Sequence, residues 1–354
     1  MDFLKIRTKL APLLICLFLA NTGCQLTYYA KSAYNQMSIL NQRVPLEKVL
    51  QDEKISAEYK VKILLAQKAK EFAEEKLSLK KSASYSTYVG LNRPYATYVV
   101  SAAPKWELKH HHWSYLFVGE MPYKGFFSLD EAKEEEESLK KQNLDTYLRG
   151  VSAYSTLGWF NDPILSSMMG YADYDLVNTI IHETVHATLY IKNSADFNER
   201  MAVFLGNKGA ELFYLDAEGK NSATLKEIQN ENEDDKKFSE FISTELNDLT
   251  TWYKAQKEQT EDLRIARIKE IQARFSQQLQ PKLTTKAHDY FAKIELNNAR
   301  LNLYKTYVQD LSDFEKLFVK VNGNFVQFLE ACKKLEKHEK PEVGLKEMIG
   351  RRPL

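Results

Sequence analysis

The stretch "IIHETVHATLYIKNSADFNER", residues 180–200, decides the fold of this chain. Its apolar residues recur at the three- and four-residue spacing of an α-helix: Ile180, Ile181, Val185 and Leu189. Asn193 and Ser194 then interrupt the pattern, and a second helical pattern follows. The stretch therefore predicts two consecutive helices, over residues 174–191 and 195–213, that are joined by a short break.

Two histidines and a glutamate in the first of these helices have the spacing of a zinc site. His182 and His186 lie four residues apart, so a helix places their imidazoles one above the other on one face. Glu183, next to His182, is placed to take a proton from a water molecule that the metal activates. The spacing predicts a catalytic Zn2+ site with Glu183 as its general base.

The third protein ligand is expected from the second helix. Zinc in a catalytic site takes three protein ligands and keeps a fourth position open. Glu199 is the expected ligand, because the break lets the second helix fold back onto the histidines. Asp196 and Glu211 are the alternatives, and two histidines that merely pack on a helix face are the non-metal interpretation. The same donors also suit other divalent transition ions.

A strand is expected directly before these helices, at residues 151–158, "VSAYSTLG". In zinc peptidases with this motif, an edge strand beside the active-site helix pairs with the extended backbone of the substrate. Tyr154 in this strand is a candidate catalytic residue that donates a hydrogen bond to the developing oxyanion, with packing as the alternative. Trp159 and Phe160 are expected mainly in the core, with a pocket for a substrate side chain as the alternative.

The first 24 residues are expected to lie outside the fold. A basic segment precedes an apolar run at residues 10–20, which is short for a membrane span and typical of a signal peptide. "NTGC", which ends at Cys24, resembles the lipobox of bacterial lipoproteins, in which the cysteine is acylated, although Asn21 replaces the usual aliphatic residue. Gln25 favours an outer-membrane anchor that faces the periplasm. An ordinary secretory signal and an uncleaved anchor are the alternatives.

The composition indicates a folded protein that does not bind nucleic acid. The chain has 354 residues, of which 44% are hydrophobic and 27% charged, so it can form a packed core in one large domain or two small ones. Its net charge of +1 gives no broad attraction to nucleic acid. After processing, Cys332 would be left as a free thiol, so no intramolecular disulfide is expected.

The remaining sequence predicts further helices around a region of strands. Helical periodicity recurs at residues 28–82, 129–143 and 288–337. Residues 85–128 are instead rich in β-branched and aromatic residues, which favour strands. Between residues 222 and 290, apolar positions recur every three to four residues. That pattern predicts two long antiparallel helices with a turn near residues 257–262.

Several segments resemble one known family. The most specific are "AYSTLGWFNDP", at residues 153–163, and the segment from "HETVH" to "FNE", at residues 182–199. They are similar to the predicted aminopeptidases of Gram-negative bacteria, HExxH zinc metallopeptidases that often carry a lipoprotein signal. The resemblance covers roughly residues 23–335 and departs from the family at Asn21 and after residue 338. It implies zinc ligands and a base at the positions that the spacing also indicates: His182, His186, Glu199 and Glu183.

We therefore expect an α+β fold that is mainly α-helical. A zincin-like active-site helix lies beside a small sheet, and a helical hairpin projects from the domain. The expected organisation is a lipoprotein signal at residues 1–23 and a single metallopeptidase domain at residues 24–338. The hairpin is an insertion at residues 222–287 of that domain, and a tail follows at residues 339–354.

The expected function is hydrolysis of peptide bonds by a zinc-dependent peptidase, with aminopeptidase action favoured. Its partners would be a peptide substrate and a membrane, through the lipid on Cys24. An aminopeptidase also needs an acidic group to hold the free amine of its substrate, and Glu120 and Asp162 are the candidates. The alternatives are an endopeptidase or cell-wall amidase at the same site, and a non-catalytic lipid-anchored scaffold with structural zinc.

Overall fold

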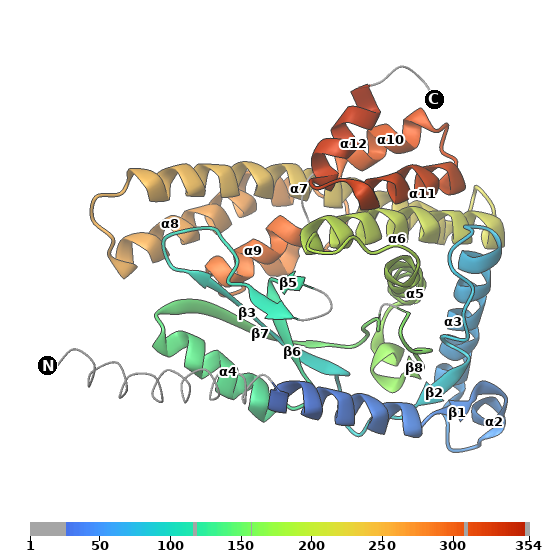
Figure 1. The fold of residues 1–354 in the computed structure, drawn as a ribbon. Helices are drawn as coiled ribbons and strands as arrows, with labels where there is room; N and C mark the ends of the chain where they lie inside the picture. The colour runs from blue at the N-terminus through green and yellow to red at the C-terminus, as the bar shows by residue number, and fades with distance from the viewer. Residues whose placement is uncertain (1–25, 116–118, 157, 308–310, 351–354) are drawn as a thin grey trace, which may run out of the picture.

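A computed structural model of the chain describes residues 26–115, 119–156, 158–307 and 311–350. The expected α+β, mainly helical fold is confirmed (Figure 1). The expected signal peptide at residues 1–23 and the lipidation site Cys24 lie outside the described residues. Within the described ranges, every helix is too short or too polar to cross a membrane.

Helices account for most of the described chain. The first covers residues 26–41. The others that precede the hairpin are α2 (Leu46–Gln51), α3 (Ala57–Glu75), α4 (Leu129–Lys141), α5 (Asp173–Thr188) and α6 (Ala195–Glu218). The hairpin and the C-terminal region contain α7 (Ala223–Ala255), α8 (Glu261–Arg274), α9 (Asn298–Tyr307), α10 (Ser312–Lys320), α11 (Phe325–Lys333) and α12 (Pro341–Gly350).

The described strands form three small sheets. One sheet has the order β6–β3–β7, with β3 antiparallel to both neighbours. The second has the order β1–β2–β8, and the third is the antiparallel pair β4–β5. The strands are β1 (Val44–Pro45), β2 (Thr87–Val89), β3 (Thr97–Pro104), β4 (Trp113–Tyr115), β5 (Gly119–Met121), β6 (Tyr123–Phe126), β7 (Leu144–Val151) and β8 (Ile164–Leu165).

The strand before α5 ends earlier than the sequence predicts. β7 stops at Val151 and residues 152–156 are not paired in a sheet, so the predicted strand at residues 151–158 is wrong. Side chains satisfy the backbone there instead of a neighbouring strand. The hydroxyl of Ser167 donates to the carbonyl of Ser152 (2.6 Å), and the N–H of Thr156 donates to the carboxylate of Asp162 (3.0 Å).

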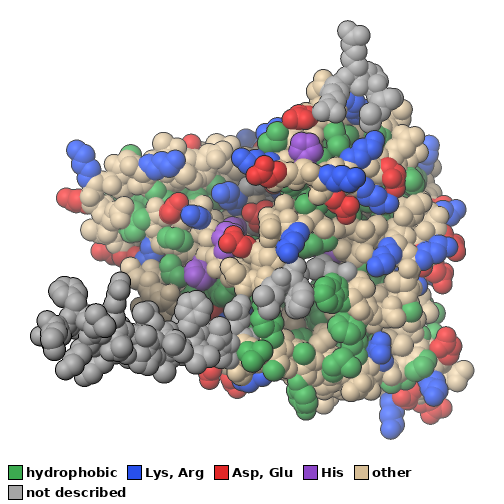
Figure 2. Space-filling model, in the orientation of Figure 1, with side chains coloured by type: hydrophobic (Ala, Val, Ile, Leu, Met, Phe, Trp, Pro, Cys, Tyr) green, Lys and Arg blue, Asp and Glu red, His purple; other side chains and the backbone are tan. Residues whose placement is uncertain are grey.

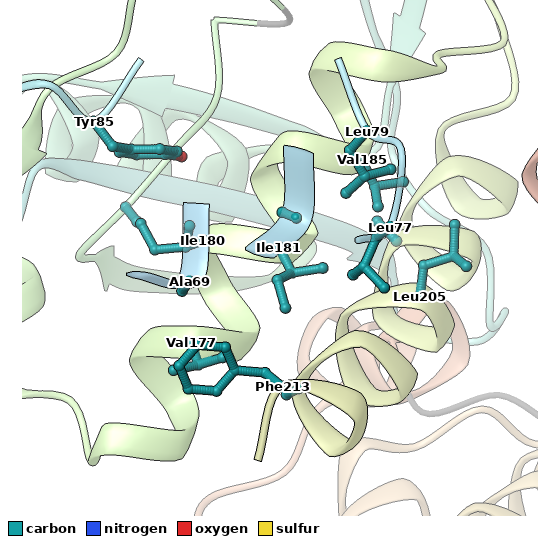
Figure 3. Close-up of a cluster of buried hydrophobic side chains, with 14 of the residues drawn as sticks. Ala69, Leu77, Leu79, Tyr85, Val177, Ile180, Ile181, Val185, Leu205 and Phe213 are labelled. Atoms are coloured by element: carbon teal, nitrogen blue, oxygen red, sulfur yellow. The ribbon is translucent and has the colours of Figure 1, made fainter. Parts of the chain in front are cut away.

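The main hydrophobic core surrounds α5, which packs against α3 and α6. Figure 3 shows the buried side chains of α5 among those of α3, α6 and the segment that follows α3: Ala69, Leu77, Leu79, Val177, Ile180, Ile181, Val185, Leu205 and Phe213. α6 comes unusually close to α5 at Gly209, where a Cβ atom would lie 2.9 Å from a methyl carbon of Ile181. The apolar residues that follow helical spacing in the sequence therefore form the face that α5 buries.

The two helices expected between residues 222 and 290 are α7 and α8, joined by residues 256–260. They have an apolar core of their own, which includes Phe238, Phe275 and Phe291. The guanidinium of Arg274 donates twice to the carboxylate of Glu245, at 2.7 Å each, and ties the helices together. The pair projects from the body of the molecule (Figure 1).

Two expectations about packing are wrong. The segment from residue 339, expected as a tail, contains α12, which packs on α10 and buries Leu345 in the main core. Its apolar residues find a partner surface on α10 and on the turn at Lys334–Lys337 that local patterning does not reveal. Trp159 and Phe160, expected mainly in the core, are 66% and 43% exposed, because the segment leaves the sheet after Val151.

Candidate metal centre

α5 holds both histidines on a helix that is fixed at its start. The ammonium of Lys62 on α3 donates to the carbonyl of Tyr171 and lies 3.1 Å from the carboxylate of Asp173. An acidic residue in the first turn also suits the positive end of the helix dipole. Because the apolar face of α5 is buried in the core, the positions of His182 and His186 beside that face are fixed as well.

The connection between α5 and α6 is fixed by Asn198, which the sequence analysis missed. Asn198 is completely buried in the first turn of α6. Its side chain accepts from the N–H of Ile191 (2.9 Å) and donates to the carbonyl of the same residue (2.7 Å). Asn193 turns the chain with a φ of +60°, which asparagine tolerates better than most residues. The connection therefore returns the chain to α5 with Glu199 in the first turns of α6.

A glycine lets the two helices approach closely beside the site. A Cβ atom at Gly206 would lie 2.7 Å from the side-chain oxygen of Asn178 and 3.4 Å from the Cβ of His182. A larger side chain would force α6 away from α5 at the level of the histidines. This glycine stands seven residues after Glu199 in the sequence, but its role in helix packing can be recognised only once the two helices are known to contact each other.

The structure brings His182, His186 and Glu199 together. The Nε2 atoms of the two histidines are 3.1 Å apart, and each lies 3.5 Å from one carboxylate oxygen of Glu199. Ligands at about 2.05 Å from a tetrahedral zinc are separated by roughly 3.3 Å, so these donors fit one ion. In the described part of the chain they form a group able to hold a metal. Of the two alternative ligands, Glu211 instead accepts from the amide of Asn232 (2.6 Å), and Asp196 is not part of this group.

Burial and neighbouring charges shift the pKa values of the two glutamates of the site in opposite directions. Burial acts to raise the pKa of Glu199, but the electrostatic interaction with His186 and hydrogen bonds with both histidines outweigh it, so this pKa lies well below its usual range. Burial raises the pKa of Glu183 to about 7, with smaller contributions from the charges of Glu199 and Asp162. Glu199 is therefore held as an anion, whereas Glu183 can take up and release a proton near neutrality.

The two acidic candidates for binding a substrate amine lie in different surroundings. Asp162 is buried, and its carboxylate accepts from the N–H and the hydroxyl of Thr156, at 3.0 and 2.8 Å. It lies close enough to Glu183 for its charge to raise the pKa of that group. Glu120 is exposed on β5, opposite Ser114 of β4.

Two tyrosines near the site differ in what their hydroxyls contact. The hydroxyl of Tyr154, the sequence candidate, donates to the side-chain oxygen of Gln36 at 2.6 Å. Tyr190, which the sequence analysis missed, follows His186 by four residues, and their ring centroids are 6.4 Å apart. Burial and the charge of Glu199 raise its pKa to about 12, and its hydroxyl lies 3.5 Å from the sulfur of Met121. Tyr190 thus has a neutral hydroxyl beside the candidate ligands, with the side chain of Asn198 and the sulfur of Met121 as its hydrogen-bond partners.

The fold and the site together define a mainly helical protein with a three-ligand candidate metal centre of the HExxH type. The chain belongs to the family described as "Putative aminopeptidase", whose model matches residues 27–344. No curated protein and no solved structure matches the chain. The matched range ends within the first turn of α12.

Proposed function

We propose that this protein is a zinc-dependent aminopeptidase. The observation that carries the proposal is the convergence of two imidazole nitrogens and one carboxylate oxygen beside a buried glutamate. Three ligands leave one tetrahedral position for water or substrate, as catalytic zinc sites do and structural sites with four protein ligands do not. His182, His186 and Glu199 would hold the ion.

A zinc ion bound there would polarise the scissile carbonyl and lower the pKa of water. Glu183 accepts the proton of the attacking water and then transfers it to the leaving amine. Its buried surroundings support this role, because they bring its pKa close to neutral pH. The depressed pKa of Glu199 keeps that side chain ionised as a ligand.

Tyr190 is the better candidate to stabilise the oxyanion of the substrate. Its hydroxyl is kept protonated by burial, and one of its two contacts, the sulfur of Met121, is a weak hydrogen-bond partner that a substrate oxygen can replace. Tyr154 was the sequence candidate for the same role. To act in it, Tyr154 would have to give up its hydrogen bond to Gln36.

Asp162 is the better candidate to hold the free amine of a peptide. Its charge acts on Glu183, so the carboxylate lies near the proposed base. A charged amine beside it would also offset the cost of burying this carboxylate. If Asp162 does not bind the amine, the same centre would serve an endopeptidase or a cell-wall amidase.

We also propose that the chain is anchored through a lipid on Cys24 to the outer membrane and faces the periplasm. The support for this proposal is the sequence alone: the apolar run at residues 10–20 and the small residues before Cys24. The helix that begins at residue 26 follows directly, so the anchor and the fold are joined without a long linker.

Cleavage of a peptide library by the purified, zinc-loaded chain tests the proposed function. We expect the wild type to release N-terminal residues from peptides with a free amine, and Glu183→Gln to release none while it keeps its zinc. Cleavage inside peptides with blocked N-termini would replace the aminopeptidase by an endopeptidase. Zinc binding without cleavage of any peptide or cell-wall fragment would favour the lipid-anchored scaffold.

A further inference from the structure

The helix at residues 26–41 exposes an apolar stripe on its outer face. Leu26, Tyr34 and Met37 are 70%, 75% and 46% exposed. Together with two exposed alanines they follow helical spacing, so they share one face: Leu26, Ala30, Ala33, Tyr34 and Met37. Figure 2 shows hydrophobic side chains gathered in this region, on the lower part of the viewed face. A continuous apolar stripe differs from the single exposed apolar residues that are normal on protein surfaces.

The inner face of the same helix already has its partners. The hydroxyl of Tyr28 donates to the carbonyl of Gly125 (2.8 Å), and its ring packs on Phe126 of β6. Ile39 and Leu40, near the end of the helix, are buried. The outer stripe is therefore not needed to hold the helix on the protein. An amphipathic helix with one docked face requires only that face to be apolar.

A second exposed apolar pair belongs to the loop that packs against this helix. Trp159 and Phe160 follow Tyr154, whose hydroxyl bonds Gln36 of the helix. At the other end of the loop, the carbonyl of Asn161 lies 3.4 Å from the guanidinium of Arg43. Hydrogen bonds on both sides of Trp159 and Phe160 thus tie their loop to the helix and to the residue two positions after it.

We propose that the stripe on residues 26–41, together with Trp159 and Phe160, lies on the surface of a lipid bilayer. We call these residues the membrane face. Tryptophan and tyrosine are the side chains that favour the boundary between lipid and water. A helix with an apolar stripe lies in that boundary with its axis parallel to the membrane. Lys31 is the one charged residue between positions 26 and 41, so the stripe offers little to a charged protein partner.

The sequence before the helix indicates lipid as the occupant. One residue, Gln25, separates Cys24 from Leu26, so the Cα atoms of these two residues lie at most about 7 Å apart. A lipid on Cys24, or the apolar run at residues 10–20 if it is retained, holds the start of this helix at the bilayer. The stripe then adds a second contact, and stable membrane attachment commonly needs two. The inference rests on the proposed membrane attachment of the N-terminal segment and is independent of the proposed peptidase activity.

Quenching of tryptophan fluorescence by brominated lipid tests the membrane face. The full chain, purified from membranes, is placed in vesicles of phosphatidylethanolamine and phosphatidylglycerol with or without bromine on the acyl chains. We expect bromine to quench part of the fluorescence of the wild type, and this part to be lost in Trp159→Tyr. The double change Tyr34→Ser with Met37→Ser should lose the same part, because the helix then leaves the lipid.

The control is Val319→Ser on α10, an apolar residue that is 65% exposed away from the membrane face and whose change should leave quenching as in the wild type. Flotation of the same vesicles reports the anchor separately. If the chains float but bromine quenches the fluorescence of Trp159→Tyr as much as that of the wild type, the proposed membrane face is wrong. The anchor would still be supported by the flotation. Disulfide-linked dimers of Met37→Cys in the vesicles would overturn the membrane face as well, because a second copy would then cover the stripe.

Discussion

Two pairs of consecutive helices in this protein use their contact surfaces differently. α5 and α6 bring His182, His186 and Glu199 into one place at their interface. α7 and α8 fill theirs with aromatic and aliphatic side chains, and their main ion pair joins Arg274 to Glu245. Each pair comes from one continuous stretch of chain and packs helix against helix, yet one holds a candidate metal centre and the other a hydrophobic core.

The difference lies in how each pair satisfies its buried polar groups. Glu245 is paired within the protein by two short hydrogen bonds from one guanidinium, so the hairpin is complete without a ligand. Glu199 has the two histidines, whose nitrogens also face each other at 3.1 Å. Donor atoms crowded in this way are best satisfied by a cation between them. α5 and α6 therefore leave a group that a metal ion would complete, whereas the ion pair between α7 and α8 is complete within the protein.

The largest effect is expected from the removal of a candidate ligand. His186→Ala should abolish zinc binding and lower kcat/KM by at least about 10³-fold, since the metal supplies several kcal/mol of transition-state stabilisation. The matched change is His288→Ala in the hairpin region, where the imidazole stacks on Phe238 and bonds Asp235. That variant should keep both zinc and activity. Loss of zinc in both variants, measured by metal analysis, would contradict the assignment.

The next largest effect is expected from Tyr190. Tyr190→Phe should lower kcat by about 100-fold with zinc content unchanged, because it removes one donor to the oxyanion. Tyr154→Phe, which removes the bond to Gln36, should change kcat by less than about threefold. Steady-state kinetics of the two variants on one peptide substrate measures both effects. A larger loss of kcat in Tyr154→Phe than in Tyr190→Phe would make Tyr154 the donor to the oxyanion.

A smaller effect is expected from Asn198, which fixes the connection that leads to Glu199. Asn198→Ala leaves the N–H and carbonyl of Ile191 without their buried partners and frees the connection between α5 and α6. Zinc affinity should fall by about 10-fold, as it does when groups that orient metal ligands are removed. Titration with a zinc chelator measures this effect, and an unchanged affinity would show that α6 is positioned by its core contacts alone.

The smallest effect on activity is expected from the hairpin. Arg274→Ala leaves the buried carboxylate of Glu245 without its partner and should lower the free energy of unfolding by about 1–3 kcal/mol. kcat/KM and zinc content should stay within error of the wild type. Urea unfolding and kinetics on the same preparation provide both numbers. A fall in kcat/KM without a fall in stability would give the hairpin a direct part in catalysis.

The sequence predicted the elements whose pattern is local. The spacing of Ile180, Ile181 and Val185 predicted α5, and the repeat between residues 222 and 290 predicted α7 and α8. The positions of the two histidines on one face follow from helix geometry alone. The placement of Glu199 needed one further step, because the break at Asn193 indicated that the second helix turns back.

The features that the sequence did not predict depend on contacts between distant segments. The strand expected at residues 151–158 ends at Val151, where Ser167 and Asp162 take over the hydrogen bonds of the backbone. Trp159 is exposed although its large apolar side chain suggests burial, because its loop lies outside the sheet. Asn198 resembles any polar residue in a helix until the structure shows that it bonds Ile191. Local patterning contains none of this information.

The most direct test of the central claim is the zinc stoichiometry of two variants on α6. Glu199→Ala removes the candidate third ligand, and Glu211→Ala removes the alternative from the same helix, where it bonds Asn232. We expect one zinc per chain in the wild type and in Glu211→Ala, and little or none in Glu199→Ala after dialysis against a weak chelator. Zinc retained by a folded Glu199→Ala at the wild-type level would contradict the proposed metal centre.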